Sequence, residues 1–85
     1  MAKYEKVYVI MYLRVDEEGI TKPVCIEWED GTRFNIDKII DERTAPPVYT
    51  GGALTRKYKV RIRGRDRTIY FDLINKRWFV EKLIY

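Results

Sequence analysis

The chain has 85 residues, which predicts a single domain spanning residues 1–85, with one modest core that folds without metal or disulfide support. A hydrophobic fraction of 46%, with two Trp, seven Tyr and three Phe, excludes a disordered chain, and the net charge of +4 is too small to define a partner by itself. The single cysteine, Cys25, cannot form an intramolecular disulfide, and neither a secretory signal nor an apolar run of about 20 residues is found, so we expect a cytoplasmic protein without a membrane partner.

A period of two dominates the pattern of apolar residues, which indicates β-strands. In the first predicted strand, residues 7–15, both faces are apolar over the central part: one carries Val7, Val9 and Met11, and the other carries Tyr8, Ile10 and Tyr12. Such a strand either lies between two covered faces or has one face covered by a partner.

The next two strands, residues 24–29 and 33–36, predict a hairpin around Gly31. A two-residue turn would mix core and surface positions on one face. A type I turn with Gly31 as the left-handed bulge residue instead pairs Ile26 with Phe34 and Glu27 with Arg33. We expect this second register, because it matches apolar with apolar and acid with base.

Two segments do not show clear alternation. Residues 37–43 fit either a continued strand or one short helical turn, and both remain open. Residues 44–55 predict a loop, since they contain paired prolines and paired glycines. Within this loop, Val48 and Tyr49 either form an exposed contact or fold back as a lid over the core.

Residues 56–67 are the strongest charge feature, with seven Lys or Arg and a single Asp. In a strand, one face would carry Lys57, Lys59, Arg61 and Arg63, and the other Tyr58, Val60 and Ile62. A four-residue loop at 64–67 then pairs Val60 with Phe71 inside the sheet and Arg61 with Tyr70 outside it.

A tighter turn at residues 75 and 76 sets Val80 opposite Phe71 and leaves Phe79 facing outward. The predicted fold is therefore all-β: an antiparallel meander of five or six strands curled into a small SH3-like barrel, with one short helical turn as an open element. Pairing of the first strand with the last would remove the exposed edges. An open sheet packed against a short helix is the alternative.

The sequence carries few residues for catalysis. It has no histidine, and one cysteine alone forms neither a zinc site nor a familiar thiol catalyst. Its glycines lack the spacing of phosphate-binding loops, and its acid pairs more plausibly solvate a surface. We therefore expect no enzyme, no metal, no cofactor and no small-molecule substrate.

The basic hairpin predicts a surface for nucleic acid, because cations and outward aromatic rings alternate there. The predicted phosphate contacts are Lys57, Lys59, Arg61, Arg63, Arg65 and Arg67, and the predicted stacking rings are Tyr70 and Phe79. Two acids on the same face, Asp72 and Glu81, would repel phosphate.

A protein partner, including a second copy of the chain, is the alternative. If Val7, Val9 and Met11 fill the core, then Tyr8, Ile10 and Tyr12 form an exposed strip on the opposite face, and exposed apolar strips are typical of protein interfaces. The unequal distribution of charge along the chain would also suit self-association.

Five short sequence motifs, spread over nearly the whole chain, resemble those of other proteins: residues 23–31 (PVCIEWEDG), 34–37 (FNID), 51–52 (GG), 58–62 (YKVRI) and 77–81 (RWFVE). The chain resembles a group of short proteins from Gram-positive, clostridia-like bacteria. That group has no assigned activity, so the resemblance implies a bacterial cytoplasmic domain and no catalytic or binding residues.

Overall fold

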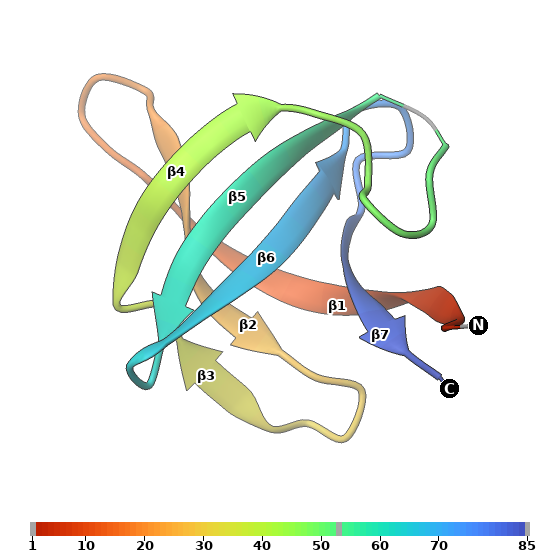
Figure 1. The fold of residues 1–85 in the computed structure, drawn as a ribbon. Helices are drawn as coiled ribbons and strands as arrows, with labels where there is room; N and C mark the ends of the chain where they lie inside the picture. Colours follow the sequence, from red (N-terminus) through yellow and green to blue (C-terminus); the bar gives the residue numbers. More distant parts are fainter. Residues whose placement is uncertain (1, 53, 85) are drawn as a thin grey trace.

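The computed structural model describes residues 2–52 and 54–84. It contains seven strands: β1 (Tyr4–Val15), β2 (Thr21–Glu27), β3 (Arg33–Asn35), β4 (Lys38–Thr44), β5 (Thr55–Ile62), β6 (Arg65–Asp72) and β7 (Trp78–Leu83). They form one sheet in the order β3-β2-β1-β7-β6-β5-β4, and every neighbouring pair is antiparallel. The sheet is curled into a half-barrel (Figure 1).

The predicted all-β class and the pairing of the first strand with the last are both confirmed, and the curled sheet is consistent with a small barrel. The described residues contain no helix, so the helical alternatives were wrong. The sheet has seven strands rather than five or six, because the ambiguous segment forms β4. This strand pairs with β5 through Ile39–Val60 and Asp41–Lys59, and a register shift at residue 40 accommodates its broken alternation.

The β2–β3 hairpin has the predicted register. Ile26 pairs with Phe34, and Glu27 pairs with Arg33, whose Nε lies 2.7 Å from a carboxylate oxygen of Glu27. Gly31 has a φ of 87°, in the left-handed region that the bulge position requires.

The predicted register of the β5–β6 hairpin was wrong. The turn consists of two residues, Arg63 and Gly64, with φ angles of 51° and 76°. Ile62 consequently pairs with Arg65, and Arg61 pairs with Asp66 instead of Tyr70. Arg65 belongs to strand β6 rather than to a loop.

The β6–β7 register also differs from the prediction, by two residues. Phe71 pairs with Trp78 rather than Val80, and Tyr70 pairs with Phe79. Five residues, 73–77, connect the strands, and the Asp72 side chain organises them by accepting hydrogen bonds from the backbone N–H groups of Ile74 and Asn75. The shorter turn at residues 75 and 76 would leave this buried carboxylate without its donors.

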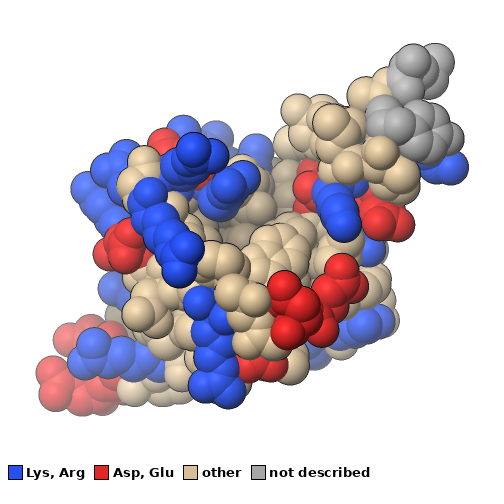
Figure 2. All heavy atoms as spheres, turned by 90° about the horizontal axis from the view of Figure 1, so that it is seen from below, with Lys and Arg blue, Asp and Glu red and all other residues tan. Residues whose placement is uncertain are grey.

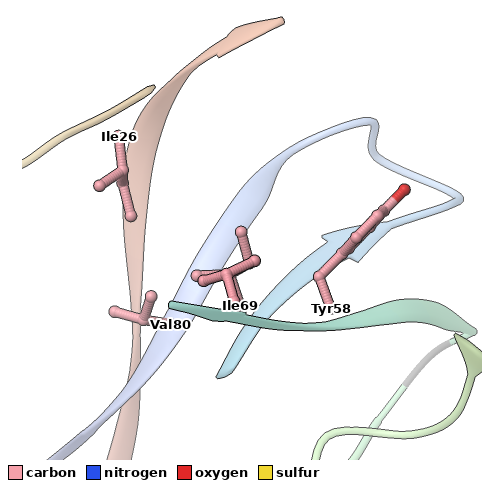
Figure 3. Packing of buried hydrophobic residues seen from close by; sticks show 5 residues of the cluster. Ile26, Tyr58, Ile69 and Val80 are labelled. Atoms are coloured by element: carbon pink, nitrogen blue, oxygen red, sulfur yellow. The ribbon is translucent and has the colours of Figure 1, made fainter. Parts of the chain in front are cut away.

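The main core lies on the concave face of the sheet and consists of Ile26, Tyr58, Val60, Ile69 and Val80. Figure 3 labels four of these side chains, Ile26, Tyr58, Ile69 and Val80, which come from four different strands. The inward direction predicted for Tyr58 and Val60 is confirmed. Burial of these apolar side chains supplies most of the stabilisation available to a sheet of this size.

A second buried cluster lies on the opposite face of the sheet and corrects the positions predicted for Tyr70 and Phe79. Their side chains are 1% and 0% exposed. They do point away from the main core, as alternation requires, but the loop between β4 and β5 covers them. Pro47 of that loop is buried, and the backbone N–H of Val48 donates to Tyr70 Oη.

We predict that Phe79→Ala lowers the free energy of unfolding by about 3–5 kcal/mol, because it leaves a cavity under the loop. Urea denaturation measures the change. Ile74→Ala, at a position that is 66% exposed, serves as the control and should change stability by about 0.5 kcal/mol or less. Equal effects of the two substitutions would contradict burial of Phe79.

Hydrogen bonds from the backbone N–H groups of Asn75 and Ile74 lower the pKa of Asp72. A carboxyl with a lowered folded pKa stabilises the protein above its unfolded pKa, and this contribution is lost as pH falls through the folded pKa. We therefore predict that the free energy of unfolding decreases below about pH 4, and that it decreases less steeply in the Asp72→Asn variant. Urea denaturation at a series of pH values tests this; parallel curves for both proteins would refute it.

Candidate functional site

Strands β6 and β7 separate soon after their connecting loop. Their ladder contains only the pairs Tyr70–Phe79 and Phe71–Trp78 among the described residues. Beyond these pairs β6 stays with β5, and β7 stays with β1 as far as Leu83. Figure 1 shows the two strands diverging. We call the space between residues 66–69 of β6 and residues 80–83 of β7 the β6–β7 split.

The sequence gives a physical reason for the split. If the ladder continued in the same register, Ile69 would meet Val80, and Arg67 would then meet Lys82. Like charges directly opposite each other destabilise an antiparallel pair. Further pairing would therefore add little stabilisation, and each strand remains paired with its neighbour on the other side.

Main-chain groups point into the split. The N–H of Asp72 donates to the carbonyl oxygen of Arg77, so alternate residues of β6, including Thr68 and Asp66, direct their backbone groups toward β7. By the same alternation, Glu81 directs its backbone groups toward β6. The split is thus edged by donors and acceptors that no strand pair satisfies within the described part of the sheet.

The split opens into a groove of about 1040 Å³, which is lined by residues of the concave face and by residues of the loop side, including Lys57 and Tyr70. Its apolar floor is the partly buried Ile62 above the core side chains Ile26, Ile69 and Val80, which are only 2%, 1% and 9% exposed, and the acids Asp66 and Glu81 also line the groove. Two partly buried rings, Trp28 and Phe34, line it as well. The groove therefore combines an apolar floor with open backbone edges.

One side of the groove is cationic. Arg63, Arg65 and Arg67 line it, and we call these three residues the arginine flank. Arg65 and Arg67 pair with Ile62 and Val60, so they stand on the concave face with the core. Figure 2 shows Lys and Arg side chains gathered beside a hollow whose visible wall is mostly uncharged.

The arginine flank differs in its partners from Lys59 and Arg61 of the same hairpin. In the described part of the chain, none of its three members forms an ion pair with a carboxylate. The guanidinium of Arg63 lies 4.7 Å from the centre of the Phe34 ring. By contrast, Arg61 lies 3.1 Å and Lys59 3.9 Å from carboxylate oxygens of Asp66. Within the described residues the flank thus forms no ion pair, although Asp66 and Glu81 also line the groove and the Asp37 carboxylate accepts a hydrogen bond from the backbone N–H of Arg63.

The predicted row of cations is divided between two faces. Lys57, Lys59 and Arg61 do share one face, as predicted, and it is the face opposite the main core. Arg65 and Arg67 lie on the other face, and Arg63 lies in the turn between them. The predicted phosphate contacts therefore do not form one continuous surface.

The aromatic rings that were predicted to stack on bases are not exposed beside these cations. The buried Tyr70 and Phe79 rings stack on each other, with centroids 5.3 Å apart. Burial also raises the pKa of Tyr70 to about 12, which keeps its hydroxyl protonated under the loop. Their assignment as base-stacking residues was wrong, because the loop covers them.

The two acids expected to repel phosphate are both engaged with the protein itself. Glu81 accepts hydrogen bonds from the backbone N–H groups of Tyr49 and Thr50, and this holds the loop against β7. The Tyr49 ring stacks on Tyr4 with centroids 3.9 Å apart. Pro47 and the backbone of the loop therefore cover the second buried cluster, whereas the Val48 and Tyr49 side chains are 58% and 61% exposed and form no lid over the main core.

The strip on β1 is exposed as predicted. The side chains of Tyr8, Ile10 and Tyr12 are 38%, 56% and 37% exposed. The Arg77 guanidinium lies 3.5 Å from the centre of the Tyr8 ring, and Tyr12 Oη donates to Glu27. Ile10, between the two rings, has the largest exposed fraction of the three.

Sequence interpretation missed Trp28 and Phe34 as functional candidates, because both occupied inward positions of a hairpin and were assigned to the core alone. No local signal marks them as groove residues. Their exposure to the groove depends on the separation of β6 from β7, which is a long-range property of the sheet.

No family model, curated protein or solved structure matches the chain. The resemblance to short bacterial proteins therefore stays a prediction. Within residues 2–52 and 54–84, no group of three or more His, Cys, Asp or Glu is arranged to hold a metal ion. The same residues include no helix that is long and apolar enough to cross a membrane.

Proposed function

We propose that this protein is a non-enzymatic cytoplasmic module that binds nucleic acid in the groove, with phosphates on the arginine flank. The observation that carries the proposal is the absence of carboxylate partners for Arg63, Arg65 and Arg67 within the described chain. Guanidinium groups form strong charge-assisted hydrogen bonds to phosphate. Their position beside a groove supports binding of an extended polyanion.

We predict that Arg65→Glu/Arg67→Glu weakens binding of a short labelled oligonucleotide by about a hundred-fold or more. Each lost charge-assisted contact contributes about 1.5–3 kcal/mol, and 1.4 kcal/mol corresponds to a factor of ten. Fluorescence anisotropy titration at several salt concentrations measures both the affinity and its salt dependence. The slope of log K against log salt should become shallower by about 1.4, the value for two phosphate contacts to a single strand.

A matched control separates local contacts from total charge. Arg14→Glu/Lys22→Glu makes the same change in net charge on a cross-strand pair that does not line the groove. This variant should keep most of the affinity. An equal loss of affinity in both double variants would mean that binding follows the overall charge of the protein. If the wild-type protein does not bind at low salt, nucleic acid is rejected as the ligand.

The exposed strip supports a second candidate function. We propose as the alternative that Tyr8, Ile10 and Tyr12 contact a second copy of the chain or another protein. The specific observation is that Ile10 is 56% exposed between two partly exposed rings on a twelve-residue strand. Contiguous exposed apolar side chains of this kind favour association.

For self-association, we predict that the sedimentation coefficient of the wild-type protein rises with concentration and that Ile10→Glu abolishes the rise, because a charge would be buried in the contact. Ile74→Glu is the matched control at another exposed isoleucine and should behave like wild type. A wild-type protein that remains monomeric at all concentrations would remove the second-copy form of this candidate.

A further inference from the structure

We propose that the groove receives unpaired nucleotides, with the sugar-phosphate backbone on the arginine flank and the bases directed into the β6–β7 split. This inference rests on the proposed function and adds which part of the strand the protein recognises. It follows from three properties of the groove: the separation of its charged and apolar surfaces, the planar groups along its wall, and its open main-chain edges.

The charged and apolar surfaces of the groove are separate. The arginine flank carries positive charge, whereas the partly buried Trp28, Phe34 and Ile62 provide the accessible apolar lining over the buried core. A phosphate on this lining would lose hydration without gaining a partner. A base has an apolar face and polar edges, so it suits the lining while its phosphate remains on the flank. A polyanion without bases would leave the lining uncovered.

The wall of the groove also carries planar groups. The Arg63 guanidinium covers the Phe34 ring at 4.7 Å, and the Trp28 indole lines the same groove. Unpaired bases stack on aromatic rings and on guanidinium planes. A duplex keeps its bases stacked on one another, so only unpaired nucleotides can use these surfaces.

Open main-chain groups complete the site. Thr68 and Glu81 face each other across the split in the register that the ladder would have followed, and both direct backbone groups into it. Base edges carry the hydrogen-bond donors and acceptors that such groups require. Arg67 and Lys82, which would repel each other in a closed ladder, are both available to phosphates at the edges of the split.

The first experiment compares a labelled oligothymidylate with an abasic oligonucleotide of the same length and charge, using the wild-type protein and anisotropy titration. We expect the oligothymidylate to bind at least about ten-fold more tightly, the effect of losing one or more stacked bases. A duplex and an oligoglutamate of matched charge should both bind more weakly than the oligothymidylate.

The outcomes distinguish the two proposals. Equal binding of the oligothymidylate and the abasic strand would overturn base recognition while nucleic-acid binding stands. Equal binding of the oligoglutamate would show that charge or strand pairing, rather than bases, is recognised, and would also overturn it. If neither oligonucleotide binds at low salt, the proposed function fails and this inference fails with it.

A main-chain variant tests the split itself. Thr68→Pro removes an N–H that points away from β5, so the β5–β6 ladder keeps its hydrogen bonds. We expect it to reduce the preference for oligothymidylate over the abasic strand, and Thr68→Val, which keeps the N–H, to retain that preference. An unchanged preference in Thr68→Pro would exclude the main-chain contact. The wild-type comparison remains decisive if the proline variant does not fold.

Discussion

The two-residue turn at Arg63 and Gly64 is the constraint on which the candidate site depends. It fixes the β5–β6 register, so that Arg65 and Arg67 become strand residues on the concave face. A four-residue loop would have placed both in a flexible connection away from the core. The same turn sets Arg61 opposite Asp66, which neutralises charge on the other face and leaves the concave face as the unpaired one.

The turn carries a conformational cost that its surroundings offset. A non-glycine residue in the left-handed region costs roughly 1–2 kcal/mol, and Arg63 has a φ of 51°. Its backbone N–H donates to the Asp37 carboxylate at 3.0 Å, and such a bond contributes about 1 kcal/mol. Its guanidinium covers the Phe34 ring, which adds roughly 0.5–1 kcal/mol. One residue of β3 and one residue between β3 and β4 thus stabilise a turn between β5 and β6.

The local sequence pattern is sufficient to predict strand register where the two residues of a cross-strand pair are close in sequence and chemically distinct. Gly31, the Ile26–Phe34 pair and the Glu27–Arg33 pair determine the β2–β3 register from the amino-acid sequence alone. The β5–β6 turn could not be predicted in the same way, because Arg63 is not a typical residue for a positive φ. The alternation of residues gives Tyr70 and Phe79 their correct direction, but only the path of the loop over them decides that they are buried.

The separation of β6 and β7 links the fold to the candidate site. Continued pairing in this region would set Arg67 opposite Lys82, and the strands keep their outer partners instead. The residues that disfavour closure are therefore also cations that an anionic ligand would neutralise. A ligand that carries negative charge and polar edges together would satisfy the cations and the open backbone groups at once. A short apolar strand could satisfy only the backbone groups, and a bare polyanion only the cations.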